Sequence, residues 1–483
     1  MENYDVIIIG AGILGTMTAR ELSRYNLKVL VIERAYDVGE GATKANSGVL
    51  YAGFHPRSRS LKGISCVQGN ALYSDICKDL QVPMSYVGSL FVAFHQEGIE
   101  TLKEKMKKGI NNGAVGLEII SGENARKMEP ALSSKILQAL YAPTTGIISP
   151  FQLILAVAKS ANLNGIEFLF QTNVIGLKKE NKSYIVHTDT GEFSADYIVN
   201  TAGEQAAPIE SLVRPADLII KPRRGQYYVF DKQPKGYKIN HVIYQAQENN
   251  EGGTLIAPTI DGNLLVGPTS ENVRSFNCNE TTKSGLSHVE AVAKKVLPDI
   301  DMGRVITSFA GVRANIKNVA KEEKDFVVRI SAPHFVSALG IKNPGMTAAP
   351  YLADKMINLL KQEGLSLIKK DNFVSKLPSN KPFLERSQKE QIELFKQNPA
   401  YGNIVCRCEK ITEGDILRVL NEPLPPKSLN GLKKRLRTGM GRCQGAFCTP
   451  NIIEILSREW HVSPDKILKS TKGSQFVKGQ VRK

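Results

Sequence analysis

The sequence contains no long apolar stretch. Among its 483 residues, no uninterrupted apolar run approaches the ~18 residues that a membrane-spanning helix requires, so an integral membrane protein is not expected. The first residues, Met1 to Tyr4, show no basic segment followed by an apolar one, and they therefore predict no secretory signal peptide. Internal repeats and low-complexity segments are also absent. We expect a cytoplasmic protein, with peripheral attachment to the inner face of a membrane as the alternative.

Extremes of composition are absent as well. Apolar residues make up 42% of the chain and charged residues 23%. These are the proportions of an ordinary globular protein rather than of a disordered, collagen-like or coiled-coil chain. At roughly 150 residues per domain, a chain of this length corresponds to about three domains.

The positive charge is concentrated at one end of the chain. The formal net charge is +16, and residues 401–483 alone carry 16 Lys and Arg against 7 Asp and Glu. A basic end of this kind can meet nucleic acid, an anionic membrane surface or an acidic protein. No aromatic-rich RNA-reading motif lies beside it, so nucleic acid is not the expected partner. The sequence leaves open whether the chain forms a homo- or hetero-oligomer.

The first 33 residues predict a strand, a helix and a second strand joined by tight turns. In order, they are a β-branched run over residues 4–9, a helical pattern over about 13–25 and an apolar run over 27–32. The first turn reads G-x-G-x-x-G and consists of Gly10, Ala11, Gly12, Ile13, Leu14 and Gly15.

This glycine motif predicts a dinucleotide site. Gly10 permits the tight turn, Gly12 lets the backbone approach a pyrophosphate, and Gly15 lets the helix pack on the strand. The helix N-terminus offers free N–H groups to the phosphates. Glu33 lies 18 residues after Gly15, at the end of the second strand, where a carboxylate can accept hydrogen bonds from a ribose. The motif alone does not distinguish FAD from NAD.

The rest of the chain predicts a mixed region of strands and helices, a linker and a small module. Strand-like runs fall at residues 89–94, 167–170, 226–230 and 263–266, helical patterns at 99–111, 150–162 and 282–296, and a strand, glycine turn and helix at 335–361. Residues 364–400 are polar and contain three prolines, which indicates an irregular linker. The tail after Pro464 is rich in lysine, and we expect it to be frayed.

One segment carries a resemblance to a known family. Residues Gly41 to Gly53, GATKANSGVLYAG, resemble the second flavin-contacting stretch of the D-amino-acid-oxidase-like FAD superfamily. Within it, the chain is similar to the glycerol-3-phosphate dehydrogenase and L-2-hydroxyglutarate dehydrogenase groups. The resemblance continues in the same order over about residues 3–362, in Thr145–Pro150, Val199–Gly203, Pro222–Tyr227, Leu265–Thr269, Gly311–Arg313 and Gly340–Thr347.

Four of the seven cysteines are clustered near the end of the chain. Cys406 and Cys408 form C-x-C, and Cys443 and Cys448 form C-x4-C after 34 intervening residues. Four thiolates can close a zinc site or hold an iron–sulfur cluster. The run Thr438–Gly445 resembles the bacterioferritin-associated-ferredoxin-like [2Fe-2S] module, which is fused to anaerobic glycerol-3-phosphate dehydrogenases and to some amine and amino-acid dehydrogenases. The resemblance implies a [2Fe-2S] cluster on these cysteines rather than zinc.

Together these resemblances imply an α/β protein with three parts. An FAD-binding Rossmann-like domain (about 1–80, 145–220 and 305–363) is interleaved with an α+β substrate domain (about 81–144 and 221–304), and a linker (364–400) leads to a [2Fe-2S] module (401–460) and a basic tail (461–483). The residues expected to hold FAD are Gly10, Ala11, Gly12, Ile13, Leu14, Gly15, Glu33, Arg34, Thr43, Lys44, Asn46, Ser47, Gly48, Val174, Thr201, Ala202, Gly203, Gly340, Gly345, Met346 and Thr347.

Three basic residues are candidates for binding an anionic substrate. Arg313 follows Gly-Val, a context in which the family binds the substrate anion, and its guanidinium suits a carboxylate or phosphate. Lys342 lies in a turn where glycerol-3-phosphate dehydrogenases often carry a lysine, which favours a phosphorylated substrate. Arg224 is either a third binding cation or part of a structural salt bridge.

The catalytic base is less clear, because Tyr51 departs from the family pattern. Relatives usually place histidine at this position beside the flavin. Tyrosine has an ordinary pKa near 10, which makes it a poor base at neutral pH. His55, four residues later, is the alternative base, unless it is a solvent-facing loop residue. Both the base and the substrate therefore stay open.

The expected reaction is oxidation of a secondary alcohol that carries an anionic group. The first expectation is conversion of sn-glycerol 3-phosphate to dihydroxyacetone phosphate, with electrons leaving through the [2Fe-2S] cluster toward a quinone-linked acceptor. That acceptor is expected to be an electron-carrier protein or a membrane-associated subunit. The alternatives are L-2-hydroxyglutarate or another 2-hydroxy acid, an amino acid or amine, and a non-catalytic flavin electron-transfer subunit.

Overall fold

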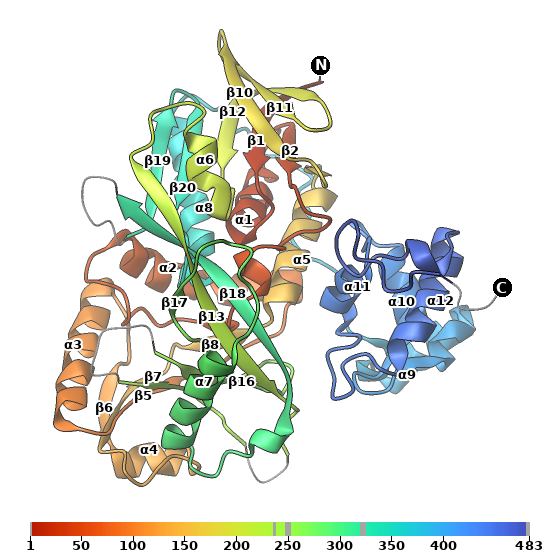
Figure 1. The fold of residues 1–483 in the computed structure, drawn as a ribbon. Coiled ribbons are helices and arrows are strands. Elements are labelled where there is room, and N and C mark those ends of the chain that lie inside the picture. The colour runs from red at the N-terminus through yellow and green to blue at the C-terminus, as the bar shows by residue number, and fades with distance from the viewer. Residues whose placement is uncertain (1, 235–237, 247–252, 319–324, 480–483) are drawn as a thin grey trace.

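Two β-sheets occupy the front part of the chain, and a small helical module follows them (Figure 1). The computed structural model describes residues 2–234, 238–246, 253–318 and 325–479. Both sheets combine segments that are distant in sequence, because the chain passes back and forth between them. In Figure 1 the first sheet lies at the top and the second at the bottom, with the C-terminal module in blue at the right.

The first sheet has a parallel centre. Its strands are β1 (Glu2–Ile9), β2 (Val29–Ile32), β9 (Glu167–Leu169), β10 (Val174–Glu180), β11 (Ser183–Thr188), β12 (Glu192–Asn200), β19 (Val327–Ala332) and β20 (Phe335–Leu339). The order β20-β12-β1-β2-β9 is parallel throughout, while β10, β11 and β19 pair antiparallel at its margins. The apolar run Val6–Ile9 is buried, as a parallel strand covered on both faces requires.

Helices cover one face of this sheet. They are α1 (Ile13–Leu22), α2 (Leu61–Leu80), α5 (Pro150–Leu163) and α8 (Gly345–Gln362). Val6 and Ile8 of β1 point into the core that these helices share, whereas Ile7 and Ile9 point into the core on the other face, beneath β10, β11 and α6 (Ala206–Glu210). The alternation follows from the two-residue period of a strand.

The second sheet lies below the first. Its strands are β5 (Ser89–Ala93), β6 (Glu118–Ser121), β7 (Gln138–Ala142), β13 (Leu218–Phe230), β14 (Val242–Gln245), β15 (Leu255–Pro258), β16 (Leu264–Gly267), β17 (Glu271–Asn272) and β18 (Val305–Asn318). Its helices are α3 (Gln96–Asn112), α4 (Gly122–Met128) and α7 (Lys283–Val296). A three-stranded sheet of β3 (Val49–Leu50), β4 (Met84–Tyr86) and β8 (Gly146–Ile148) completes the body. The long antiparallel pair β13 and β18 forms the floor of the site described below.

The C-terminal module has its own small core. It consists of α9 (Gln388–Gln397), β21 (Ile404–Cys406), β22 (Ile411–Thr412), α10 (Glu413–Leu420), α11 (Leu429–Leu436) and α12 (Cys448–Trp460). Short 3-10 helices occur in both parts of the chain. In the body they are η1 (Ala42–Lys44), η2 (Gly203–Gln205) and η3 (Met302–Arg304), and toward the C-terminus they are η4 (Phe383–Glu385), η5 (Pro399–Gly402) and η6 (Pro464–Lys466). Cys406 and Cys448 belong to the module core together with Ile416, Leu432 and Leu456.

Ion pairs fix the module against the body. Lys434 of α11 lies 2.5 Å from a carboxylate oxygen of Glu40 and 3.1 Å from one of Asp37, and Arg435 lies 2.6 Å from Asp37. Burial raises the pKa of the Asp37 carboxyl, but the two cations outweigh burial and hold that pKa below its usual value. Arg437 adds a contact of 2.7 Å to Asp261 of the second sheet.

The structure confirms the predicted α/β class and corrects three details. Residues 305–318, expected in the FAD-binding domain, form β18 and hydrogen-bond to β13 of the second sheet. The expected irregular linker contains α9, which begins with a capping box between Ser387 and Glu390. The tail is not entirely frayed, because Ile467 is fully buried in the module core.

Within the ranges that the structure describes, no helix is both long enough and apolar enough to cross a membrane.

Candidate active site and cofactor sites

Of the three glycines in the turn after β1, Gly12 is the one that has open space where a side chain would be. Gly10 adopts φ +101°, and a Cβ on it would lie 2.7 Å from the carbonyl oxygen of Thr201. A Cβ on Gly15 would lie 2.0 Å from the carbonyl oxygen of Gly10, because α1 packs directly on the turn. At Gly12 the nearest atom to an added Cβ is Thr43 Oγ1, at 3.6 Å. The open space at Gly12, beside the N-terminus of α1, fits a pyrophosphate.

Glu33 stands where the sequence predicts the ribose contact. Its two carboxylate oxygens accept the N–H groups of Ala11 at 2.8 Å and Ala35 at 2.9 Å. Burial raises the pKa of Glu33, and the two backbone donors act in the opposite direction. A carboxylate oriented in this way retains lone pairs for the hydroxyl groups of a ribose.

Residues 42–48, here called the flavin loop, are held by their own side chains. The hydroxyl oxygen of Thr43 accepts the N–H of Ile13 at 3.1 Å, which joins the loop to α1. Asn46 donates to the Thr43 carbonyl oxygen at 2.6 Å and accepts the N–H of Gly48 at 2.8 Å. The loop therefore has one fixed path past the glycine turn.

A pocket of about 110 Å³, the flavin pocket, lies beside this loop. The flavin loop, residues 312–314 of β18 and the first turn of α8, including Gly345, Met346 and Thr347, line it. Thr347 Oγ1 also accepts the N–H of Tyr51 at 3.1 Å. Three segments that the sequence assigns to flavin binding thus meet at one pocket, and with the open turn at Gly12 they fit FAD.

The other predicted FAD residues occupy different settings. Thr201 donates its hydroxyl to the carbonyl oxygens of Ile9 and Gly10 and so supports the turn, with Ala202 and Gly203 directly after it. Gly340, at φ +67°, packs against Ile316 and precedes α8. Arg34 forms an ion pair with Glu204, Lys44 pairs with Glu40, and Val174 and Leu14 are buried. Direct contact of these side chains with FAD stays a prediction.

Two glycine substitutions are expected to separate folding from FAD binding. Gly15→Ala places a Cβ against backbone 2.0 Å away, so we expect a lower melting temperature and loss of FAD. Gly12→Ala meets no protein atom closer than 3.6 Å, so we expect near wild-type melting of the apoprotein but at least tenfold weaker FAD binding. Circular dichroism and the flavin-to-protein absorbance ratio measure the two effects. Equal FAD retention by Gly12→Ala and the wild type would contradict the assignment of the space at Gly12 to the pyrophosphate of FAD.

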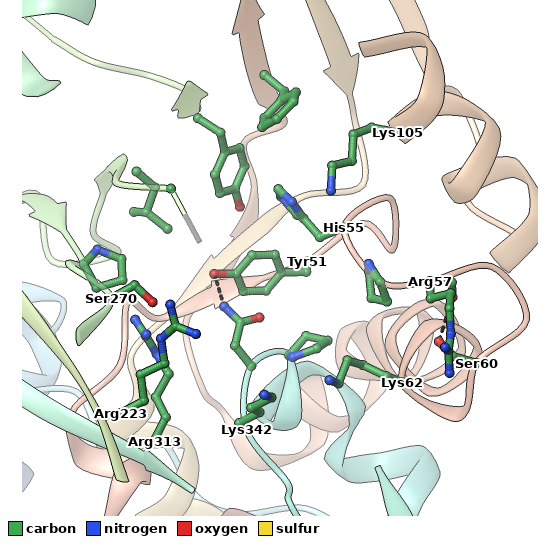
Figure 2. A pocket seen from close by; sticks show the side chains of 18 of the residues that line it. Tyr51, His55, Arg57, Ser60, Lys62, Lys105, Arg223, Ser270, Arg313 and Lys342 are labelled. Atoms are coloured by element: carbon green, nitrogen blue, oxygen red, sulfur yellow. Dashed lines mark hydrogen bonds between the residues drawn. The ribbon is translucent and has the colours of Figure 1, made fainter. Parts of the chain in front are cut away.

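A larger cavity of about 510 Å³, the substrate cavity, adjoins the flavin pocket (Figure 2). Tyr51, Arg313, Lys342 and Asn343 line both cavities. The described residues around the substrate cavity include one carboxylate, Asp325, and six basic side chains, namely Arg57, Lys62, Lys105, Arg223, Arg313 and Lys342. Such an excess of positive charge favours a small anionic ligand.

Arg223 and Arg313 form the centre of this positive field. They are directly opposite each other on the antiparallel strands β13 and β18, and both face the cavity. Arg313 donates to the carbonyl oxygen of Thr269 at 3.4 Å, while the buried Nε of Arg223 has no hydrogen-bond partner among the described residues. Like charges directly opposite each other destabilise a sheet unless an anion lies between them. The pair therefore fits a phosphate or carboxylate.

The other two predicted cations differ in their environment. Lys342 lines the cavity, and its ammonium group donates to Asn315 Oδ1 at 2.8 Å. Arg224 instead pairs with Glu271 and Glu280, which favours the structural alternative given for it. Because neighbouring strand residues point to opposite faces, Arg224 turns away from the cavity and Arg223 faces it.

His55 lies at the substrate cavity, as a candidate base must. It lines the cavity, and its buried Nε2 has no hydrogen-bond partner among the described residues. Burial and the nearby Lys105 hold the pKa of His55 well below its usual value, so its ring is neutral at pH 7. Its ring centroid lies 5.7 Å from that of Tyr51 and 4.7 Å from that of Tyr244. The solvent-facing alternative for His55 is wrong.

Tyr51 is better suited to donating a hydrogen bond than to removing a proton. Burial raises the pKa of its hydroxyl to about 12, so this group stays protonated at neutral pH. Asn343 donates to the Tyr51 hydroxyl oxygen at 2.7 Å, as the dashed line in Figure 2 marks. The hydroxyl proton is therefore directed away from Asn343.

The four clustered cysteines meet as two pairs. Cys406 hydrogen-bonds with Cys448, and the sulfur atoms of Cys408 and Cys443 lie 3.6 Å apart. The Cys448 contact is the main cause that lowers the pKa of Cys406 below its usual value. In the described ranges no three His, Cys, Asp or Glu side chains converge on a single point as ligands of one metal ion would. Two pairs of thiols fit the two iron atoms of a [2Fe-2S] cluster, each of which takes two cysteines.

The loop around these cysteines is shaped for close packing. A Cβ on Gly441 would lie 2.2 Å from the Cβ of Cys408, so glycine is required there. The backbone N–H groups of Gly445 and Phe447 face the Cys443 sulfur and act to lower its pKa. Hydrogen bonds to sulfur of this kind tune an iron–sulfur cluster.

Comparison with known families agrees with both cofactor sites. Residues 5–359 match the family model described as FAD dependent oxidoreductase. The chain belongs to this family. Residues 404–458 match the BFD-like [2Fe-2S] binding domain. This FAD-dependent oxidoreductase thus carries FAD in its body and a [2Fe-2S] cluster in its C-terminal module.

Individual relatives narrow the kind of oxidoreductase. The chain is 38% identical to a glycerol 3-phosphate dehydrogenase of Caloramator mitchellensis over 99% of both chains. It is 30% identical to the glycerol 3-phosphate oxidase of Mycoplasma pneumoniae, over 78% of this chain and 98% of that one. The dithionite-reduced, FAD-bound structure of the Mycoplasma pneumoniae oxidase superimposes with a TM-score of 0.73, covering 78% of this chain and all of the other. The chain is an FAD-dependent oxidoreductase similar to glycerol-3-phosphate dehydrogenases.

Sequence reasoning missed several residues of the substrate cavity. Arg223, Lys62, Lys105 and Asn343 were not among the predicted site residues, although all line it. Strand alternation predicts that only one of Arg223 and Arg224 shares a face with Arg313, but the pairing of β13 with β18 is needed to decide which. Lys62 and Lys105 come from helices α2 and α3, and nothing in their local sequence signals a shared cavity.

Proposed function

We propose that this enzyme oxidises sn-glycerol 3-phosphate to dihydroxyacetone phosphate. The observation that carries the proposal is the opposed pair Arg223 and Arg313 in a cavity lined by six basic side chains. A phosphate dianion accepts two-pronged hydrogen bonds from guanidinium groups better than a neutral alcohol does. Similarity to glycerol 3-phosphate dehydrogenase and oxidase over most of the chain supports the same substrate.

The residues of the cavity have distinct roles in this reaction. Arg223 and Arg313 hold the phosphate, and Lys342, fixed by Asn315, adds a third positive charge. His55 is neutral and accepts the proton of the C2 hydroxyl at Nε2. Tyr51, positioned by Asn343, donates a hydrogen bond to the oxygen of the substrate. Bound FAD supplies the acceptor for the hydride from C2.

A 2-hydroxy dicarboxylate such as L-2-hydroxyglutarate is the second candidate. Cations lie at two ends of the cavity, with Arg223 and Arg313 on one side of Tyr51 and Arg57 and Lys62 on the other (Figure 2). A substrate with two carboxylates can bridge these groups. Human mitochondrial L-2-hydroxyglutarate dehydrogenase is 29% identical over 65% of this chain and 78% of that protein.

Anaerobic bleaching of the flavin absorbance tests the substrate. Holoenzyme is mixed with glycerol 3-phosphate, L-2-hydroxyglutarate or an amino acid in turn. Fastest bleaching by glycerol 3-phosphate supports the proposal, and fastest bleaching by another compound overturns it in favour of that compound. Bleaching by none of them, but by a reduced partner protein, would identify an electron-transfer subunit instead.

We also propose that electrons leave through the [2Fe-2S] cluster toward a quinone-linked acceptor. An acidic electron-carrier protein or a membrane-associated subunit would take the electrons from the cluster. Near the cluster ligands, Phe447 is 80% exposed and the side chain of Arg442 is 84% exposed. An apolar group beside a positive charge suits the docking of an acidic partner. The cluster passes electrons singly, whereas oxidation of the alcohol releases two.

Cys406→Ser is expected to separate the two halves of the reaction. The variant should lose the cluster and oxidation of glycerol 3-phosphate by a membrane fraction, yet retain most of its activity with a phenazine dye. Cys278→Ser, which lies outside the module, serves as the control. Equal loss of activity with both acceptors would count against the route through the cluster.

A further inference from the structure

A third cavity lies between the flavin loop, the second sheet and the C-terminal module. This interdomain cavity has a volume of about 440 Å³. Ala45, Asn46 and Ser47 line both this cavity and the flavin pocket, so one stretch of chain separates the two. Met440 and Gln444, which precede and follow the ligand Cys443, line the opposite wall. The cavity therefore lies between the two cofactor sites.

The three cavities follow one another along one face of β13. Arg223 faces the substrate cavity, Tyr227 the flavin pocket and Val229 the interdomain cavity. These positions are separated by even numbers of residues, so their side chains share a face of the sheet. On β18, Arg313 and Thr307 are the cross-strand neighbours at the two ends of this row. The same sheet face thus leads from the substrate to the module.

The chemistry of the interdomain cavity differs from that of the substrate cavity. Its sheet side is largely apolar, with Val229, Ile260, Leu265 and Phe309. The module side presents cations of α11 and the turn after it. Lys434 and Arg437 are each paired with carboxylates, namely Glu40, Asp37, Asp261 and Glu409.

Lys433 is the exception among these cations. It lines the cavity and forms no ion pair with any carboxylate of the described residues. Burial is the main influence that lowers the pKa of Lys433, with Lys469 and Arg437 adding to it and Cys448 acting in the opposite direction. A half-buried ammonium group at the edge of an apolar slot is a donor for a ligand oxygen.

We propose that the interdomain cavity binds the ring of a quinone acceptor, with Lys433 as the donor to a quinone oxygen. The inference rests on the proposed function, because it names the site of the oxidant. The substrate alcohol loses two electrons and two protons to become a ketone, and the quinone gains two electrons and two protons to become a hydroquinone. The volume lies in the range of small-molecule sites, about 300–1,000 Å³. The paired guanidinium groups that suit glycerol 3-phosphate are not part of its described lining.

Direct binding of 2-hydroxy-1,4-naphthoquinone to oxidised holoenzyme tests the site. Val229→Trp fills the slot, and an aromatic residue is tolerated in a strand. Lys433→Gln replaces the charged ammonium donor with a shorter, neutral amide on the surface of a helix. Calorimetry or equilibrium dialysis should show at least tenfold weaker binding for each variant than for the wild type. Ile219→Trp, on an exposed position of the same strand, and Lys472→Gln, an exposed charge, are the matched controls.

Two results would overturn the site. One is absence of naphthoquinone binding to the wild type, and the other is equal binding by the wild type and Lys433→Gln. Should Val229→Trp misfold, Lys433→Gln decides alone. Anaerobic bleaching by glycerol 3-phosphate requires no quinone. If glycerol 3-phosphate bleaches the flavin but the naphthoquinone does not bind, only the quinone site is contradicted. If glycerol 3-phosphate does not bleach the flavin, the proposed function is contradicted.

Discussion

Replacing Arg313 with methionine is expected to lower kcat/KM for glycerol 3-phosphate about 100- to 1,000-fold. Removing one partner of a buried, hydrogen-bonded charge pair costs about 2–5 kcal/mol, and each 1.4 kcal/mol is tenfold. Arg223→Met should have an effect of similar size, because the two guanidinium groups face each other across β13 and β18. The measurement is dye reduction over a range of substrate concentrations.

A control separates specific binding from a general effect of charge. Lys221→Met removes a positive charge from an exposed position two residues before Arg223, outside the substrate cavity. We expect less than a threefold change for this variant. The double variant of Arg223 and Arg313 should lose less free energy of transition-state binding, calculated from kcat/KM, than the two single variants lose together. The reason is that both residues bind the same anion. A full sum would indicate two independent binding sites.

The second large effect is expected at His55. His55→Gln should slow flavin bleaching at saturating glycerol 3-phosphate by about 10²–10⁴-fold, the usual contribution of a general base. The substrate concentration at half-maximal rate should change little, because the phosphate is held elsewhere. Tyr51→Phe should be much milder, since that hydroxyl keeps its proton at neutral pH. A larger loss for Tyr51→Phe than for His55→Gln would reverse the two roles.

The pH dependence of bleaching gives an independent check on His55. Neutral imidazole is the active form, and burial and Lys105 hold the pKa of His55 well below 6.5. The wild-type rate should therefore stay constant as the pH falls to about 6.5. Lys105→Met removes the neighbouring cation, so the pKa of His55 rises and the rate should begin to fall at a higher pH. Lys107→Met, on an exposed position of the same helix, should leave the profile unchanged.

The cofactor sites were predictable from sequence because their signals are local. The turn from Gly10 to Gly15 and the acid Glu33 lie within one strand–helix–strand unit. The four cysteines are likewise close in sequence and distinctive in type. In each case the physical requirement, a turn without side chains or a set of thiols, can be satisfied by few residue types.

The substrate cavity was only partly predictable because it is assembled from distant segments. Arg223 and Arg224 are indistinguishable in sequence, and only the pairing of β13 with β18 decides which of them faces Arg313. The apolar pattern predicts β13 only over residues 226–230, since charged residues interrupt it, and the family resemblance extends the strand back to Pro222. Lys105 affects His55 from a separate helix, α3, which sequence periodicity cannot place.

The ion pairs between α11 and the body link the assembly of the two redox centres. Lys434 and Arg435 bind Asp37 and Glu40, which lie between Glu33, the predicted ribose ligand, and the flavin loop. FAD bound at its predicted residues on either side of this stretch would restrict the same backbone that the module contacts. By thermodynamic reciprocity, any factor by which flavin loading tightens module docking is also the factor by which docking tightens flavin loading. Charge removal at Lys434 or Arg435 would therefore reach beyond the module and weaken the hold of the body on its flavin.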